Sequence, residues 1–162
     1  MANRKKVYDS RGHDNPGNGV GVIIPNPNNP DEIVMTLRTA ETTNSAGMWE
    51  LPGGKQDLFE TIYQAGSRET FDEVGLEVCI KGCIDICDLR IEGQHWMNYT
   101  VVAEVKGGEL TNKEDLKFDE VRYMNIHELP ENTALLAIRG IRNYITKRQH
   151  LEYILIETVV QD

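Results

Sequence analysis

"GKQDLFETIYQAGSRETFDEVGL", residues 54–76, contains the helical pattern from which the rest of the fold is inferred. From Glu60 to Val74 there is no proline, and small or apolar residues recur at the spacing of one helical face. These residues are Ile62, Ala65, Gly66, Thr70 and Val74. We expect a helix that turns this face toward a core and ends at Gly75, a left-handed C-terminal cap.

Three carboxylates crowd onto one face of the same helix. Glu69, Asp72 and Glu73 are three and four positions apart, a spacing at which like charges repel by about 0.2 to 0.5 kcal/mol per pair. They also fall in the last turns, where the helix macrodipole is negative and favours Lys or Arg. A solvated charged face is the common explanation of such a run. A hard divalent cation such as Mg²⁺, which takes oxygen ligands, is the alternative.

The whole stretch follows a longer spacing pattern. Gly54 is followed after five residues by Glu60, and after seven more by RETFDEVGL, residues 68–76. This pattern closely resembles the box of the Nudix family, G-x5-E-x7-R-E-U-x-E-E-x-G-U, in which U is aliphatic. The similarity extends to WELPGGK, GVGVII and HELP elsewhere in the chain, and covers roughly residues 18–130.

The resemblance implies a fold and a metal site. The fold is α/β, a Nudix-type α/β/α sandwich in which helices cover a mixed β-sheet. The implied ion is Mg²⁺, with Mn²⁺ as an alternative, bound by the Gly53 carbonyl and four carboxylates. The carboxylates are those of Glu69, Asp72, Glu73 and Glu114. Glu114 belongs to the charged loop GGELTNKEDL and is chosen over Glu104, Glu109 and Glu120.

The resemblance also assigns catalytic roles within the box. Glu69 or Glu73 would help to deprotonate the attacking water. Glu60 and Arg68 would orient the loop and the carboxylates.

Two positions depart from the family pattern. Thr70 occupies an aliphatic position, where its hydroxyl is expected to bond back to the helix. Asp72 replaces the first glutamate of the final pair, and its shorter side chain is expected to reach the metal through a water or to shift the ion. The second change is the one hint of a rival interpretation, a Nudix-fold module that binds a nucleotide without cleaving it.

The implied reaction is hydrolysis of a nucleoside triphosphate to a monophosphate and pyrophosphate by a metal-activated water. Similarity to MutT-like enzymes favours this substrate class, with a modified dNTP as a candidate. The alternative is an ADP-ribose or nucleotide-sugar pyrophosphatase. ADP-ribose hydrolases tend to have a proline shortly after the box, whereas this chain has none between Pro52 and Pro130.

Candidate substrate contacts follow from residue type. Aromatic faces stack on nucleobases, although strand aromatics more often belong to a core. The aromatic candidates are Trp49, Trp96, Tyr99 and Tyr123. Arg38 and Lys55 are the basic candidates for contact with the nucleotide, and solvent exposure is the competing interpretation for both.

Composition limits the other classes of function. With 162 residues and 40% hydrophobic content, the chain is expected to form one domain, residues 18–162, after a flexible tail, residues 1–17. The formal net charge of -9 argues against a nucleic-acid polymer as partner, because such surfaces need clustered Lys and Arg. No apolar run reaches the length of about 18 residues that a membrane span needs. We therefore expect a cytoplasmic protein with no membrane partner.

The remaining elements are predicted from β-branched and turn patterns. A hairpin is expected from the strands at residues 19–29 and 32–38, and further strands at 48–55, 76–91, 95–105 and 121–126. A second amphipathic helix is expected at residues 133–147, and LEYILIETVV, residues 151–160, is a candidate edge strand or homodimer contact.

Three cysteines share the fourth predicted strand. Cys79, Cys83 and Cys87 are evenly spaced, which places all three on one strand face. We expect buried, reduced thiols there and not a metal cluster.

Overall fold

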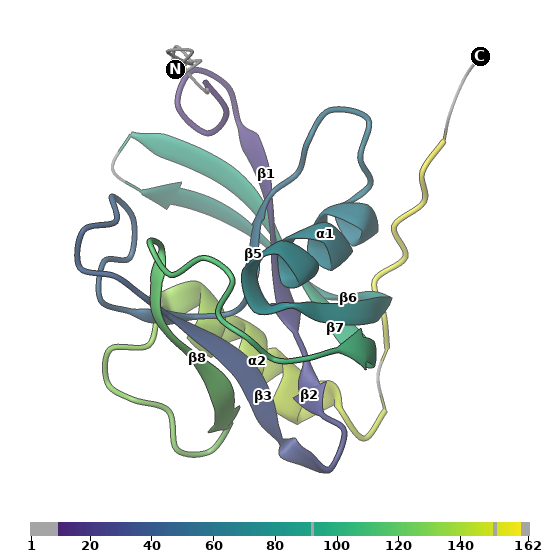
Figure 1. Ribbon diagram of the computed structural model, residues 1–162. Helices are drawn as coiled ribbons and strands as arrows, with labels where there is room; N and C mark the ends of the chain where they lie inside the picture. The colour runs from purple at the N-terminus through teal and green to yellow at the C-terminus, as the bar shows by residue number, and fades with distance from the viewer. Residues whose placement is uncertain (1–9, 92, 151, 160–162) are drawn as a thin grey trace.

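The computed structural model describes residues 10–91, 93–150 and 152–159 of the 162-residue chain. This part of the chain forms two β-sheets and two helices (Figure 1). The strands are β1 Gly17–Ile23, β2 Pro25–Asn26, β3 Asn29–Arg38, β4 Trp49–Glu50, β5 Gly53–Lys55, β6 Leu76–Ile91, β7 Gln94–Gly108 and β8 Phe118–Asn125. The helices are α1 Ile62–Val74 and α2 Leu135–Lys147.

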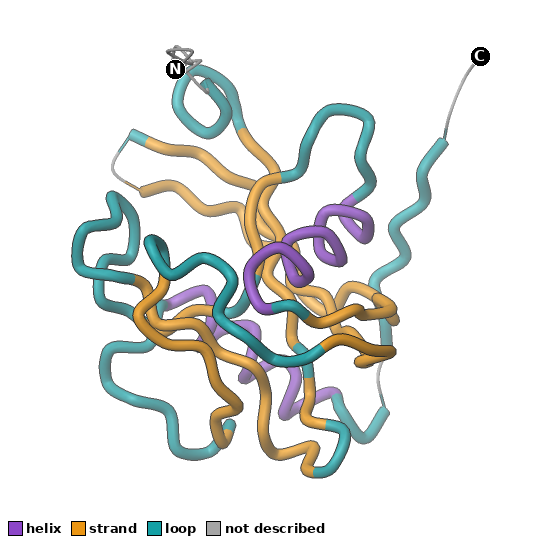
Figure 2. Tube along the Cα trace, viewed as in Figure 1, coloured by secondary structure: helices purple, strands orange, loops and turns teal. Residues whose placement is uncertain are grey.

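The first sheet has the strand order β5-β1-β7-β6. It is mixed, because β1 runs parallel to β7 and antiparallel to β5. The second sheet has the order β2-β3-β4, with β8 paired to β3, and all of its pairs are antiparallel. Figure 2 shows the two helices on different sides of the strands.

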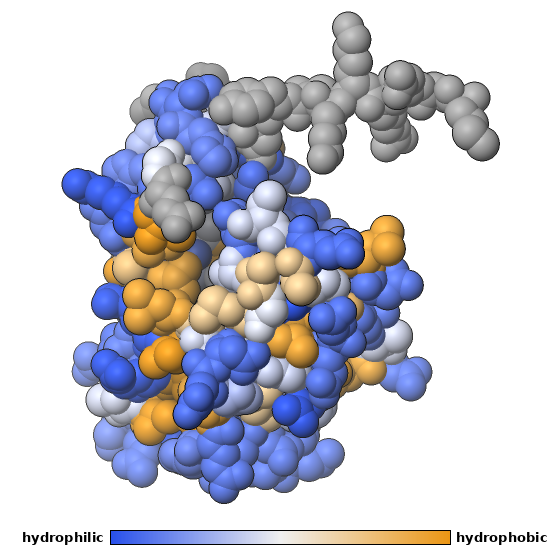
Figure 3. All heavy atoms as spheres, turned by 90° about the vertical axis from the view of Figure 1, so that its left-hand side faces the viewer, coloured by the Kyte–Doolittle hydropathy of each residue, from blue (hydrophilic) through white to orange (hydrophobic). Residues whose placement is uncertain are grey.

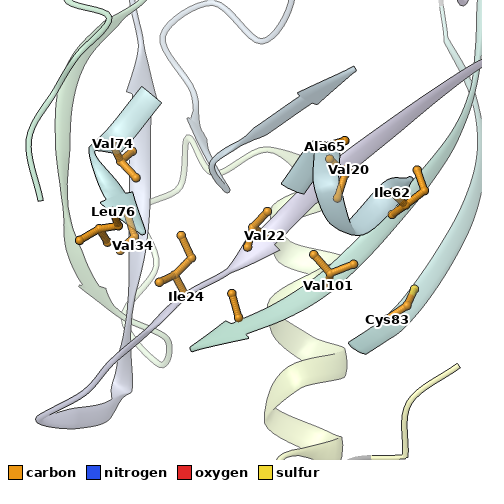
Figure 4. Close-up of a cluster of buried hydrophobic side chains, with 11 residues drawn as sticks. Val20, Val22, Ile24, Val34, Ile62, Ala65, Val74, Leu76, Cys83 and Val101 are labelled. Atoms are coloured by element: carbon orange, nitrogen blue, oxygen red, sulfur yellow. The ribbon is translucent and has the colours of Figure 1, made fainter. Parts of the chain in front are cut away.

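Alternating side chains of the first sheet divide the core in two. Val22 and Val101 belong to the cluster under α1, whereas their chain neighbours Ile23 and Val102 belong to the cluster under α2. Figure 4 shows Val22 and Val101 near Ile62 of α1. A sheet covered on both faces by helices is the predicted α/β/α sandwich, which the structure confirms.

Helix α1 ends at the predicted Gly75 cap, but it begins at Ile62, inside the predicted stretch that starts at Glu60. At its N-terminus Thr61 Oγ1 accepts a hydrogen bond from Gln64 N–H at 3.1 Å, and Gln64 Oε1 accepts one from Thr61 N–H at 2.8 Å. This reciprocal capping box starts the helix. At its C-terminus Gly75 has φ 74°, and a Cβ there would lie 2.7 Å from the Glu109 carbonyl oxygen. The five predicted core residues are all buried, and Glu73 is buried with them.

Two strand predictions need correction. The expected strand 19–29 is split, because β1 pairs with β5 and β7 in one sheet while β2 forms the hairpin with β3 in the other. The expected strand 48–55 is also two strands, β4 and β5, one in each sheet. A proline lies at each break: Pro25 is the first residue of β2, and Pro52 lies between β4 and β5.

The cysteines do not share one strand face. Cys83 is buried, Cys87 is half-buried and Cys79 is exposed. Pairing of β6 with β7 shifts register between Ile80 and Gly82 and again between Cys83 and Asp85. Each shift inserts a residue and reverses the alternation of side chains, which the even spacing could not predict.

Described segments near each end of the chain contact the rest of the domain. Residues 10–16, assigned above to the tail, include Arg11, whose Nη1 donates to the Gln56 carbonyl at 2.6 Å. The remaining tail residues 1–9 lie outside the described part. Near the other end, Ile154 N–H donates to the Cys83 carbonyl at 2.7 Å as an isolated antiparallel bridge, and Ile154 and Ile156 pack against the first core cluster.

The surface carries scattered apolar side chains among hydrophilic ones, as Figure 3 shows for one face. Such scatter is ordinary for a folded domain. None of the described helices is long and apolar enough to cross a membrane.

Candidate metal and nucleotide site

Glu73 is the most deeply buried of the acidic residues on α1, with its side chain 1% exposed. Its Oε2 accepts a hydrogen bond from Gly53 N–H at 2.9 Å, and its Oε1 accepts one from Lys117 Nζ. Burial raises the pKa of Glu73 to about 7, although Lys117 and Gly53 favour the charged form. A carboxyl group with such a pKa can exchange a proton near neutral pH, which suits proton transfer.

Arg68 organises the neighbouring carboxylates. Its Nε and Nη2 donate to the two oxygens of Glu60 at 2.8 and 2.9 Å, which is a bidentate pair. Its Nη1 donates to Glu69 Oε1 at 2.9 Å, and its Nη2 also reaches the Lys55 carbonyl at 3.0 Å. The Arg68 hydrogen bonds lower the pKa of Glu60. This geometry supports the positioning role predicted for Glu60 and Arg68.

The glycine turn lies directly against these acids. A Cβ at Gly54 would come within 2.5 Å of the Glu69 carboxylate, so a side chain there would displace Glu69. Gly53, which comes directly before Gly54 in β5, supplies the backbone N–H that binds Glu73. The turn therefore fixes two of the box glutamates.

Glu114 comes close to Glu73 through the loop between β7 and β8. Within this loop Lys117 Nζ lies 3.1 Å from Glu114 Oε2, a buried atom with which it forms an ion pair. The loop is tied to the end of α1 by hydrogen bonds from Thr111 N–H to the Val74 carbonyl and from Lys113 N–H to the Glu73 carbonyl, both 3.0 Å.

The three other glutamates considered as the metal ligand outside the box lie elsewhere. Glu104 pairs with Lys81 and Lys106, and Glu120 pairs with Arg122. Glu109 is exposed.

Asp72 differs from its neighbours, because its side chain is exposed while that of Glu73 is buried. Across residues 10–91, 93–150 and 152–159, no group of three His, Cys, Asp or Glu side chains is already arranged to hold an ion. The physical reason is that Arg68 holds Glu69 and Lys117 holds Glu73 in ion pairs. The expected convergence of three carboxylates is therefore not present in this state.

A cleft of about 220 Å³ opens on the opposite side of the glycine turn. It is lined by residues of β1, β5, β7 and α2, and by the loop after β3. Its polar or aromatic side chains are Arg38, Asn44, Glu50, Lys55, Trp96, Asn98 and Thr100. Because Gly53 and Gly54 also line the cleft, it is continuous with the turn that holds the carboxylates.

Three of the predicted substrate contacts line this cleft: Arg38, Lys55 and Trp96. The Lys55 ammonium lies 5.2 Å from the centre of the Trp96 ring. A Cβ at Gly12 or Gly17 would come within 2.2 or 2.3 Å of the same ring, so the backbone of the N-terminal segment packs on the indole.

The other aromatic candidates do not line the cleft. Trp49 is 4% exposed and belongs to the second core cluster, and Tyr99 and Tyr123 pack against the first. Successive side chains of β7 point to opposite faces of the sheet. Trp96, Asn98 and Thr100 face the cleft, so Tyr99 faces α1 instead. Trp49 is thus a core residue, and Tyr99 and Tyr123 are half-buried beside the first core cluster.

Comparison with known proteins agrees with this geometry. The profile of the NUDIX domain matches residues 15–145. The chain belongs to the Nudix family. Among curated relatives, "Putative nudix hydrolase 1" of Caenorhabditis elegans is 27% identical over 85% of this chain and 38% of its own length. "Putative 8-oxo-dGTP diphosphatase 3" of Mycobacterium tuberculosis is 29% identical over 74% of this chain and 57% of its own length.

A solved structure shows the same Nudix fold. The MutT NUDIX hydrolase of Burkholderia pseudomallei superposes with a TM-score of 0.69 at 24% identity, covering 79% of this chain and 97% of that protein. The chain spans only about 38% and 57% of the two curated relatives.

Nudix hydrolases generally use a divalent metal, typically Mg²⁺. The donor chemistry here fits such an ion, because the available groups are hard carboxylate oxygens. Glu114 Oε2 is buried and has a cation, the Lys117 ammonium, 3.1 Å away, so this oxygen already lies in a place that favours positive charge. Glu69, Glu73 and Glu114 are the residues that would hold the ion.

Sequence reasoning missed Glu50 and Asn98. Glu50 Oε2 lies 3.4 Å from Arg38 Nη1, and burial raises the pKa of Glu50. The amide of Asn98 has no hydrogen-bond partner among the described residues and faces the cleft. Strand alternation starting from Trp96 would have identified Asn98, whereas nothing local marks Glu50, whose position depends on the pairing of β4 with β3.

Proposed function

We propose that this protein hydrolyses a nucleoside triphosphate, with a modified dNTP as the candidate substrate, to a monophosphate and pyrophosphate. The observation that carries the proposal is the shared glycine turn. Gly53 and Gly54 contact the box glutamates on one side and line the cleft on the other. A nucleoside in the cleft would therefore direct its phosphates toward the carboxylates.

Different residues would have different roles in such a reaction. Bound Mg²⁺ would neutralise the phosphate oxygens and lower the pKa of an attacking water. Glu69 and Glu73 are the candidates to help deprotonate that water. Arg68 holds Glu69 and Glu60 in fixed orientations, so that little reorganisation is needed during the reaction.

Charge supports an ion-assisted mechanism. The net charge of -9 repels a polyphosphate, so local cations must attract it. Lys55 and Arg38 line the cleft and supply two such charges at its polar end, and the metal would supply more.

The substrate assignment rests on similarity and on cleft chemistry. One relative carries the name of an 8-oxo-dGTP diphosphatase, which names a triphosphate substrate of that protein. In this chain, the side chains that line the cleft include the Glu50 carboxylate and the Asn98 amide. A purine with both donors and acceptors on its edge offers partners to this pair.

The test is a substrate panel in the presence of Mg²⁺. Unmodified dNTPs, 8-oxo-dGTP, 8-oxo-dGDP, ADP-ribose and nucleotide sugars are incubated with the protein, and the products are separated. We expect a triphosphate to turn over fastest. Preferential cleavage of ADP-ribose or of a nucleotide sugar would move the protein to the alternative class. Binding of nucleotides with no turnover of any of them would support a binding module.

A further inference from the structure

Lys117 already supplies a positive charge where the metal is expected. Its ammonium donates to Glu73 Oε1 and lies 3.1 Å from Glu114 Oε2, so it bridges two of the proposed ligands. The Lys117 side chain is 33% exposed and that of Glu73 is 1% exposed.

Both oxygens of Glu73 are occupied in this arrangement. Gly53 N–H binds Oε2 at 2.9 Å, and Lys117 Nζ binds Oε1. A divalent ion on Oε1 would lie in contact with the ammonium, and two cations at that distance repel strongly in a buried site. The ion and the ammonium therefore cannot share Oε1 in this geometry.

The backbone around Lys117 is fixed, whereas its side chain can move. Lys117 N–H donates to the Glu114 carbonyl at 2.8 Å, and Asn112 Nδ2 donates to the Phe118 carbonyl at 2.7 Å. The four-carbon stem leads outward to a partly exposed ammonium. Movement of the side chain alone would release Glu73 and Glu114.

We propose that Lys117 is an internal counter-cation that competes with the divalent ion for Glu73, and that the ion enters only when this ammonium leaves. The inference rests on the proposed metal site. It assigns Lys117 a positioning role: without an ion, it keeps a buried carboxylate neutralised and the loop between β7 and β8 docked on α1.

The test measures Mn²⁺ binding without substrate, by the electron paramagnetic resonance of free Mn²⁺. Lys117→Met is compared with the wild type, with Lys117→Arg and with Lys113→Met. Lys113 is a matched control on the same loop, since its Nζ contacts the Phe71 carbonyl and ring instead of a carboxylate. Both Met variants remove one charge, so a general field effect acts on them alike.

We expect Lys117→Met to bind Mn²⁺ about tenfold more tightly than the wild type or more, corresponding to at least about 1.4 kcal/mol. Lys113→Met should stay within about twofold, and Lys117→Arg should remain close to the wild type. If the wild type binds Mn²⁺ and Lys117→Met binds it no more tightly, or if Lys113→Met gains as much affinity, the proposed role of Lys117 is wrong and the metal site still stands. No Mn²⁺ binding by the wild type or any variant would contradict both the role of Lys117 and the proposed metal site.

A second measurement needs no variant. In wild-type protein with ¹³C-labelled lysine, the ε-methylene resonance of Lys117 should shift on addition of Mg²⁺, while that of Lys81, which pairs with Glu104 on the far edge of the sheet, should not. A Lys117 resonance that stays unchanged at saturating Mg²⁺ would show that the ammonium remains on Glu73, and the proposal would fail.

Discussion

The acidic residues of α1 have different environments despite their regular spacing. Glu73 is buried between the glycine turn and Lys117, Glu69 is held by Arg68, and Asp72 is exposed. The shorter side chain of Asp72 occupies the position where the family has a glutamate. The three residues should therefore contribute unequally to catalysis.

Substitution at Glu73 should be the more damaging change. Glu73→Gln keeps the size of the side chain but removes its charge and its capacity as a base, so kcat should fall by about 10²-fold or more. Asp72→Asn should lower kcat by about tenfold, the low end for groups that act around a metal. Steady-state kinetics at saturating Mg²⁺ give the comparison, and circular dichroism verifies the fold. Equal losses in the two variants would mean that Asp72 is a direct ligand.

Asn98 should affect substrate binding more than the chemical step. Its unpartnered amide faces the cleft, so Asn98→Leu should raise KM by about 10- to 100-fold, the cost of one lost hydrogen bond to a buried group, with little change in kcat. Tyr99→Phe is the control, because the adjacent side chain packs on the opposite face of β7. A normal KM in Asn98→Leu would remove Asn98 from the nucleotide site.

Helix α1 depends on stabilisation from both ends. Its last turn contains no basic residue, yet Lys113 and Lys117 of a distant loop bring their ammonium groups to its C-terminal carbonyl and carboxylate groups. These contacts offset the charge that the acidic residues place at the negative end of the helix dipole. The loop between β7 and β8 is thus part of the helix's stability as well as of the site.

The N-terminal capping box should be measurable in stability. Thr61→Ala removes the acceptor for Gln64 N–H and should lower the free energy of unfolding by about 1 kcal/mol. Thr61→Ser retains the hydroxyl and should lose much less. Urea unfolding in EDTA measures both, and no difference between the two variants would mean that the box contributes nothing.

Local patterns predicted α1, its buried face and the strand β6 closely, because periodicity and a glycine cap are properties of adjacent residues. The placement of β1 between β5 and β7 and the contact of Lys117 with Glu73 were not predictable, since each joins segments far apart in sequence. The cysteine prediction failed at the β6 register shifts for a similar reason. Irregular pairing depends on the partner strand, which a single-strand pattern does not include.

Across the whole molecule, several acidic side chains of this strongly acidic chain form ion pairs with Arg or Lys. Arg68 binds Glu60 and Glu69, Lys117 binds Glu73, and Arg139 binds both oxygens of Asp85 at 2.6 and 2.9 Å, which joins α2 to β6. The resulting stability should depend on pH.

The Glu60–Arg68 pair gives the sign of that dependence. Because Arg68 lowers the pKa of Glu60 in the folded state, the pair stabilises the fold fully above the ordinary value of 4.5 and loses this contribution as pH falls through the lowered value. Glu60→Gln should therefore unfold more easily at pH 7 and show a flatter decline of the free energy of unfolding below pH 4.5. Parallel curves for the two proteins would contradict the assignment.

The most direct test of the proposed activity is ³¹P nuclear magnetic resonance of the products. Wild-type protein with Mg²⁺ and 8-oxo-dGTP should yield a nucleoside monophosphate and pyrophosphate in equal amounts, and EDTA or Glu73→Gln should suppress both signals. Release of orthophosphate, or an intact triphosphate for this substrate and for every unmodified dNTP, would contradict the account.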